Sequence, residues 1–281
     1  MLAVSGGEPL LYNGLVELLD AARAAGLATT LTTNGTVLTR SRLAQLRTRL
    51  DLLALSLDGV PESHDRIRNC RGAFARLEGN MPAVRESGIR FGFIFTLTQH
   101  NLHELDWVAA FALEHGAQLL QVHPLELAGR ARAQMVEEHP DALELGFGFA
   151  EALRLRAQLQ GRLHIHLDVA TRPGVRELAQ HDGDQAAPTR LADAVSPLVV
   201  EADGTVVPLT YGFPRAFALG NLHDAPLQVL GPHWLATTYD RYHATVSRLH
   251  SDDVWPARLP VLNLYEAAVA VASEVAPGTP V

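Results

Sequence analysis

The fold is decided by residues 1–35, MLAVSGGEPLLYNGLVELLDAARAAGLATTLTTNG. The apolar residues 1–4 predict a strand that ends at the turn Ser5-Gly6-Gly7-Glu8-Pro9. Residues 13–25 then place apolar side chains at helical spacing, and residues 27–33 are rich in strand-forming residues. A strand, a helix and a second strand joined at these lengths predict a parallel β-α-β unit.

The same alternation continues through the first half of the chain. We expect further strands over 52–57, 89–97, 119–123 and 163–168, and helices over 39–50, 72–87, 102–115 and 141–160. Alternating strands and helices are typical of a parallel sheet with helices outside, so the fold class is α/β. A parallel (β/α) barrel, complete or partial, is the geometry we expect, with ligands at the carboxyl ends of its strands.

The pattern changes after about residue 180. Residues 181–190, HDGDQAAPTR, are polar and predict a linker. Beyond them, residues 197–201 and 205–207 flank Ala202-Asp203-Gly204, which predicts a β-hairpin. We therefore expect a partial barrel over 1–180 and a small β-containing segment over 191–281, whose remainder has no clear period.

Composition excludes several classes of protein. The net charge of −8 argues against a nucleic-acid partner. All 23 cationic residues are Arg, which excludes a Schiff-base lysine. No apolar run is long enough to cross a membrane, and the first residues do not form a secretory signal. With Cys70 as its one cysteine, the chain forms no internal disulfide, and we expect a cytoplasmic protein.

Two polar groups follow the predicted strands. Adjacent glycines in the turn after residues 1–4 leave backbone N–H and C=O groups open to a ligand, although an ordinary strand-to-helix turn explains them equally well. Ser56 at a strand end and Arg68 farther along suit a carboxylate, since a hydroxyl donates one bond and a guanidinium a forked pair. The alternative is that Asp58-Gly59 is a tight turn and Arg68 lies on a solvated face.

Two further groups of residues in the sequence contain histidines and are candidate sites. His164, His166 and Asp168 alternate along one strand and share a face, which fits either a two-histidine, one-carboxylate metal site or a polar edge of the sheet. We favour the polar edge and predict no metal ligands. His100, His103 and Glu104 follow another strand, and as helix-cap and surface residues they need no special role. The chain contains no Gly-x-Ser-x-Gly, His-Glu-x-x-His or P-loop motif, so hydrolase and NTPase functions have no support.

Taken together, these stretches resemble the radical SAM superfamily, and its SPASM-type members in particular. The resemblance covers residues 1 to about 132, with a fainter similarity in PLVVEADGTVVP and LGNLHDAPL. It is carried by SGGEPLLY, LTTNGTVLT, LSLDGVPESHDRIR, RGAF, ESGI, TLTQHNLHEL, EHGAQ and PLELAGRA, in the family's order.

The resemblance implies a function. Members of the family use S-adenosylmethionine (SAM) and a [4Fe–4S] cluster to form a 5′-deoxyadenosyl radical that abstracts a substrate hydrogen, and SPASM-type relatives often modify peptides. By position, the backbone of Gly6, Gly7 and Glu8 would hold the amino group of SAM, Ser56 and Arg68 its carboxylate, and Asn34 would line the same cavity. No catalytic acid or base is identified.

The sequence also departs from the family. The Cys-x-x-x-Cys-x-x-Cys loop that binds the cluster lies upstream of Gly-Gly-Glu-Pro in the family and is absent here, as is the first barrel strand. Leu209 follows Pro208 where SPASM members have a cysteine, so we expect no auxiliary clusters. Two interpretations stay open: an N-terminally truncated enzyme, or a degenerate, non-catalytic homologue that binds a ligand or a peptide. We expect no membrane partner, and the oligomeric state is left open.

Overall fold

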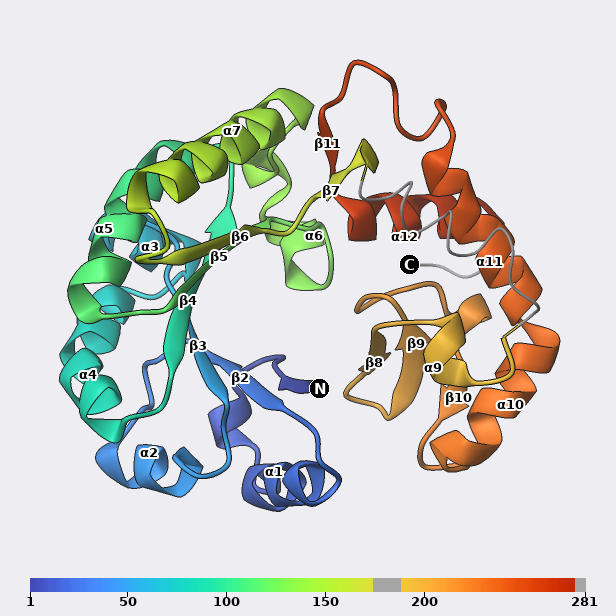
Figure 1. Cartoon of the computed structure of the whole chain (residues 1–281), viewed down its shortest axis with the longest axis horizontal. Coiled ribbons are helices and arrows are strands. Elements are labelled where there is room, and N and C mark those ends of the chain that lie inside the picture. The colour runs from blue at the N-terminus through green and yellow to red at the C-terminus, as the bar shows by residue number, and fades with distance from the viewer. Residues whose placement is uncertain (174–187, 276–281) are drawn as a thin grey trace. The chain divides into compact units, whose positions relative to one another are not determined.

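The computed structural model describes residues 1–173 and 188–275 (Figure 1). Contacts divide the chain into two compact units. The first unit comprises residues 1–125 and 143–168, and the second comprises residues 126–142 and 169–281. This contact division places residues 126–142 and 169–180 with the second unit, while the three segments expected from the sequence, 1–180, 181–190 and 191–281, stay a prediction. Most of the predicted linker 181–190 lies outside the described residues and stays a prediction.

The first unit is built on a six-stranded sheet. Each strand pairs in parallel with the next along the chain, in the order β1-β2-β3-β4-β5-β6. This confirms the predicted α/β class with a parallel sheet. The strands are β1 (Leu2–Val4), β2 (Thr29–Thr33), β3 (Leu52–Ser56), β4 (Phe91–Leu97), β5 (Leu119–Pro124) and β6 (His164–Leu167).

Helices connect these strands and lie along the outer side of the sheet, as Figure 1 shows for α1, α2, α4, α5 and α7. Local signals set their ends: Thr39 accepts a hydrogen bond from the Arg42 N–H at the start of α2, and Gly72 and Gly88 flank α4 in left-handed conformations. The helices are α1 (Leu15–Ala24), α2 (Arg40–Leu46), α3 (Pro61–Ile67), α4 (Ala73–Ser87), α5 (Leu105–His115) and α7 (Ala142–Leu159). We did not predict α3, because its sequence PESHDRI has no apolar period.

The two faces of the sheet differ in chemistry. One face is fully buried, and its side chains include Leu31, Leu53, Leu55, Phe93, Phe95, Leu120 and Val122, each 0% exposed. Burial of each such side chain contributes roughly 1.5–3 kcal/mol. The other face is polar and partly exposed. The strand register aligns Ser56, Ile94, Gln121 and His166 in one row across it. This face, called the open face below, carries the polar strand ends.

The second unit contains the predicted hairpin. Strands β8 (Leu198–Val200) and β9 (Thr205–Pro208) pair antiparallel, which confirms it, and β10 (Gly220–Asn221) adds a third strand. Its core includes Trp234, whose indole N–H donates to the Phe217 carbonyl at 2.8 Å. The remaining elements are β7 (Ala170–Thr171), β11 (Val261–Leu262), α6 (Arg130–Gln134), α9 (Leu191–Ala194), α10 (Leu227–Thr237), α11 (Tyr239–Ser247) and α12 (Leu264–Val275).

Helices α10 to α12 were not predicted. Pro232 lies inside α10, and the alternation AAVAVA in α12 has the period of a strand. Within residues 1–173 and 188–275, no helix is long and apolar enough to cross a membrane.

Two glycines give a test of the sheet. A Cβ on Gly92 in β4 would lie 2.6 Å from the Leu119 carbonyl oxygen of β5, whereas one on Gly79 in α4 would meet no atom within 4 Å. We predict that Gly92→Ala lowers the free energy of unfolding by about 1–3 kcal/mol, because β4 and β5 must separate. Gly79→Ala, the matched control, should raise it by about 0.5–1 kcal/mol. Denaturant titration measures both, and equal effects of the two substitutions would contradict the pairing of β4 with β5.

Candidate functional site

The polar residues predicted from the sequence gather at the carboxyl ends of β1, β2 and β3. Gly6 and Gly7 follow β1, Asn34 follows β2, and Ser56 ends β3. Gly6 has a φ of +117°, and a Cβ on either glycine would meet no atom within 4 Å. The backbone of this turn is therefore exposed and open to a ligand.

Glu8 fixes that turn to the next strand. Its carboxylate accepts hydrogen bonds from the Thr33 hydroxyl at 2.7 Å and from the Asn34 N–H at 2.9 Å. It also accepts the Leu10 N–H at 3.1 Å, which caps a 3-10 helix over Pro9–Leu11. The Glu8 side chain thus holds the glycine turn in place, and its backbone remains beside the open glycines.

Asn34 and Ser56 differ in what their side chains already bind. The Asn34 side-chain oxygen accepts from the Thr36 N–H at 2.9 Å and from the Thr36 hydroxyl at 2.6 Å, so it shapes the turn after β2. Ser56 is 6% exposed, and its hydroxyl has no hydrogen-bond partner among the described residues. The Ser56 oxygen is not among the fully buried unbonded atoms of the described residues, so it stays open to solvent, and Ser56 is the stronger candidate for contact with a ligand.

Arg68 is paired within the protein. Its Nε and Nη2 lie 2.5 Å and 3.0 Å from the two carboxylate oxygens of Asp58, which is 0% exposed. Asp58 also accepts the Thr96 N–H of β4 at 3.2 Å. Burial alone would raise the pKa of Asp58, but the Arg68 charge and hydrogen bonds outweigh it and lower that pKa to about 2. Arg68 therefore does not lie on a solvated face, and its fork binds Asp58.

The Asp58 pair sets a pH-dependent stability. A carboxyl group whose pKa is about 2 when folded, against an ordinary 3.8, stabilises the fold above the ordinary value. We predict that Asp58→Asn costs roughly 3 kcal/mol at neutral pH, because it leaves the Arg68 charge uncompensated. The difference from wild type should shrink as the pH falls from about 5 towards 2.

Denaturant titration at several pH values measures this difference. Asp20→Asn is the matched control, because Asp20 is exposed and its ion pair with Arg49 is worth at most about 1 kcal/mol. A penalty for Asp58→Asn that stays constant over this pH range would show that its charge is not the cause.

Glu104 corrects an expectation from the sequence. Rather than a surface residue with no special role, it is 8% exposed and holds the loop after β3. Its carboxylate accepts the Val60 N–H at 2.9 Å and the Ser63 hydroxyl at 2.6 Å. Gly59, at a φ of +130°, leaves the space for it, since a Cβ there would lie 1.9 Å from the Glu104 Oε2.

A second polar group lies at the ends of β5 and β6. Asp168, just beyond β6, has one carboxylate oxygen 3.0 Å from His123 Nδ1 and 2.5 Å from Gln121 Nε2, and the other 2.9 Å from His166 Nε2. Burial would raise the pKa of Asp168, but these hydrogen bonds and the nearby histidines lower it. Sequence reasoning missed His123, although its position at a strand end was a usable signal.

The predicted histidine face is therefore assembled differently. His166 and Asp168 meet His123, while His164 is exposed and takes no part in the group. In the part of the chain that the structure describes, no three His, Cys, Asp or Glu residues are arranged to hold a metal ion.

Cysteine placement bears on a [4Fe–4S] cluster. Cys70 is exposed in the connection between α3 and α4, with its sulfur 2.8 Å from Arg76 Nη2. A [4Fe–4S] cluster is held by several thiolates, and the chain has one cysteine. Leu209, where SPASM members have a cysteine, has a φ of +65° and packs against the core of the second unit. The residues of this chain do not fit a cluster.

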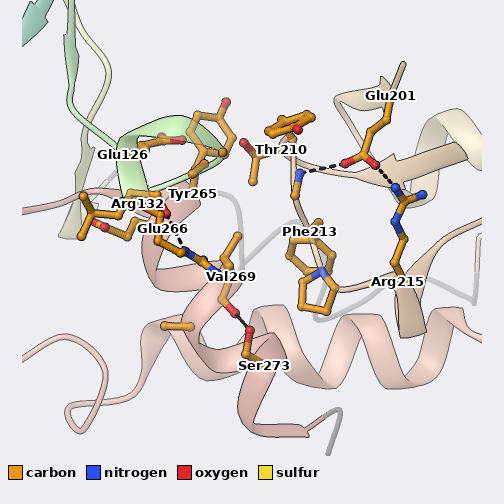
Figure 2. Close-up of a pocket in the computed structure, with 17 residues that line it drawn as sticks. Glu126, Arg132, Glu201, Thr210, Phe213, Arg215, Tyr265, Glu266, Val269 and Ser273 are labelled. Carbon is orange, nitrogen blue, oxygen red and sulfur yellow. Dashed lines mark hydrogen bonds and ion pairs between the residues drawn. The ribbon is translucent and has the colours of Figure 1, made fainter. Parts of the chain in front are cut away.

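The second unit contains a pocket of about 670 Å³ (Figure 2). Its walls come from residues 126–132, residues 210–215 and α12. Glu201, whose side chain is 6% exposed, accepts the Gly212 N–H at 2.9 Å and pairs with Arg215 at 2.5 Å. Tyr211 and Tyr265 add aromatic surface, whereas Phe213, also in the wall, is 1% exposed and belongs to the core of this unit. The sequence did not predict this pocket, because three distant segments form it and α12 was not recognised.

Comparison with known proteins gives related sequences. The sequence model of the Radical SAM superfamily matches residues 1–112. A PqqA peptide cyclase from Ruegeria pomeroyi is 35% identical over 164 residues, which are 58% of this chain and 44% of that protein. An Fe-coproporphyrin III synthase from Methanosarcina barkeri is 31% identical over 139 residues, 49% of this chain and 35% of that protein. The matched region spans less than half the length of either relative.

Solved structures show the same fold across most of the chain. The anSMEcpe structure with bound AdoMet and Kp18Cys peptide has a TM-score of 0.64 at 17% identity, covering 97% of this chain and 82% of that one. Streptococcus suis SuiB bound to precursor peptide SuiA has a TM-score of 0.63 at 15% identity, covering 94% of this chain and 59% of that one. At these identities the likeness concerns the fold.

Proposed function

The chain belongs to the radical SAM superfamily, and from that premise we propose that it binds SAM on the open face, at the ends of β1, β2 and β3, as part of SAM-dependent radical chemistry on a peptide. The observation that carries the proposal is the Ser56 hydroxyl, which has no partner among the described residues and is open to solvent although the residue is only 6% exposed. Ser56 ends β3, and the open glycine turn follows β1, so one strand, β2, lies between them.

Each end of the methionine moiety has a candidate partner. The backbone of Gly6, Gly7 and Glu8 binds its amino group, because that turn exposes peptide groups that no side chain covers. Ser56 donates a hydrogen bond to its carboxylate. Asn34 lines the same cavity through the turn that its side chain stabilises.

Arg68 contributes less than the resemblance implies. Its fork is held by Asp58, so a SAM carboxylate would receive one hydrogen bond from Nη1 instead of a forked pair. The side chain is 30% exposed, which leaves Nη1 within reach of a ligand. Ser56 is therefore the main proposed partner of the SAM carboxylate, and Arg68 is a secondary one.

The proposal assigns SAM binding, and not cluster binding, to these 281 residues. Radical formation in the family needs a cluster, and one cysteine does not fit it. The same observation favours a second candidate function, a non-catalytic homologue that binds SAM or a peptide.

A peptide is the substrate class that the second unit favours. Its pocket combines two accessible aromatic rings, Tyr211 and Tyr265, with three carboxylates, Glu126, Glu201 and Glu266, against the guanidinium groups of Arg132 and Arg215. This excess of carboxylates repels the anionic propionates of a tetrapyrrole, the ligand class that the synthase relative suggests. Exposed aromatic rings and backbone groups suit an extended peptide. A cytoplasmic location is part of the proposal, since peptide substrates of this kind are made there.

Ser56 tests the SAM site. We predict that Ser56→Ala weakens SAM binding at least about tenfold, because a hydrogen bond to a charged group is worth about 1.5–3 kcal/mol. Thr30→Val is the matched control, since Thr30 lies in the amino half of β2, away from the carboxyl ends of the strands. Isothermal titration calorimetry measures both. Equal affinities for wild type and Ser56→Ala would remove Ser56 from the site, and no binding by wild type would refute the proposal.

SAM cleavage separates the two candidate functions. The chain is incubated without oxygen with iron, sulfide, dithionite and SAM, and 5′-deoxyadenosine is measured by mass spectrometry. We expect these 281 residues to bind SAM without cleaving it, because they lack the thiolates for a cluster. Release of 5′-deoxyadenosine at a catalytic rate would contradict this division and exclude the non-catalytic function.

Tyr211 tests peptide binding. Its side chain is 56% exposed at the pocket, and Tyr12, at 59% exposed in the first unit, is the matched control. We predict that phage-displayed random peptides enriched on the wild-type chain lose binding to Tyr211→Ser and keep it on Tyr12→Ser. A chain that enriches no peptide, or loses binding equally in both variants, would exclude the pocket as the peptide site.

A further inference from the structure

We propose that Asp168, His123 and His166 form an acid–base site in which His166 takes a proton from a hydroxyl, amide or ammonium group of the substrate. The inference rests on the proposed function only in placing the substrate on the open face. Its geometry comes entirely from the first unit.

The carboxylate fixes which nitrogen of each ring carries hydrogen. An ionised carboxylate only accepts hydrogen bonds, so the ring nitrogen that faces it must be the donor. His123 therefore carries hydrogen on Nδ1 and His166 on Nε2. The Nδ1 of a neutral His166 is then an unprotonated, basic nitrogen, and the side chain is 54% exposed, so an incoming group can reach it.

The Asp168 carboxylate can stabilise a positive charge on these rings. Its side chain is 14% exposed, it accepts hydrogen bonds from Gln121 and His123, and its other oxygen lies 2.9 Å from His166 Nε2. Although burial would raise the pKa of Asp168, its hydrogen bonds keep that pKa below the ordinary value, so the group is a carboxylate at neutral pH. A carboxylate behind an imidazole orients the ring and stabilises the imidazolium that forms.

The site lies in line with the proposed SAM site. His166 is in the same row across the open face as Ser56, separated from it by Ile94 and Gln121. Three strand spacings of about 4.8 Å place the two residues roughly 14 Å apart. A substrate lying along this row would contact His166 at one end and SAM near Ser56 at the other.

The step is a simple proton transfer. The Nδ1 of His166 accepts the proton from the substrate group, which keeps the bonding electron pair, and the imidazolium faces Asp168. Since the ring is half exposed, water then takes the proton. Besides His166 and Asp168, the titratable residues on this face of β5 and β6 are His123 and His164, so these are the groups that face the proton-accepting ring.

The alternative is that Asp168, His123 and His166 have a purely structural role and only link the ends of β5 and β6. A structural link requires only that Asp168 bonds to both strands, and it does not require that the His166 ring becomes more nucleophilic. The reactivity of that ring therefore separates the two roles.

Diethyl pyrocarbonate, which acylates unprotonated imidazoles, is the probe. The full chain is treated without SAM at a series of pH values from neutral to about 9, and acylation of each histidine is followed by mass spectrometry, so that the rates are compared at high pH, where the imidazoles are unprotonated. We expect His166 to react several-fold faster than His164, an exposed histidine on the same strand and face that has no carboxylate partner among the described residues. Asp168→Asn should bring the rate of His166 down to that of His164. Asp106→Asn, which removes an exposed carboxylate paired with Arg154, should leave the ratio unchanged.

Equal rates for His164 and His166 in wild type would overturn the proposal. So would a ratio that Asp168→Asn leaves unchanged, including the case in which that variant only lowers the melting temperature. If Asp168→Asn does not fold, nitrogen-15 NMR of the wild-type histidines decides instead, because hydrogen on Nε2 rather than Nδ1 of neutral His123 contradicts the arrangement. SAM is absent throughout, so failure of SAM binding and failure of this site are seen separately.

Discussion

Three carboxylates hold the carboxyl edge of the six-stranded sheet together, and each joins one pair of neighbouring strands. Glu8 joins the end of β1 to β2, Asp58 joins β3 to β4, and Asp168 joins β5 to β6. Strand ends in a parallel sheet leave peptide and side-chain groups that the ladder does not bond. A carboxylate accepts several of the N–H and O–H donors among these groups at once. It therefore fixes the positions of the strand ends, where the proposed ligand contacts lie.

This use of carboxylates divides structural groups from groups that a ligand can use. The carboxylate oxygens of Glu8, Asp58 and Glu104 accept hydrogen bonds from other groups of the protein. The Nε and Nη2 of Arg68 are bound to Asp58. Among the groups described above, those left for a ligand are the backbone of the glycine turn, the Ser56 hydroxyl, the Nη1 of Arg68 and the outer nitrogen of His166.

Most of the first unit could be predicted from the sequence, because its signals are local. Apolar runs and glycine stops mark the strands and helices from residue 1 to about 168, and the Ala202-Asp203-Gly204 hairpin is equally local. Helix α3 and helices α10 to α12 lack such a period. The predicted site residues of the first three strands do share one edge. The pairing of Arg68 with Asp58, the burial of Glu104 and the meeting of His123 with Asp168 depend on tertiary contacts, which no local pattern reveals.

The most direct test of the SAM site is hydrogen exchange of the full chain with and without saturating SAM, followed by mass spectrometry. We predict slower exchange in peptides that cover residues 5–8 and 56–59, because bound SAM would cover the glycine turn and the end of β3 together. Peptides from the pocket of the second unit, residues 210–215, should not change. Protection at 210–215 with none at the strand ends would contradict the account and place SAM in the other unit.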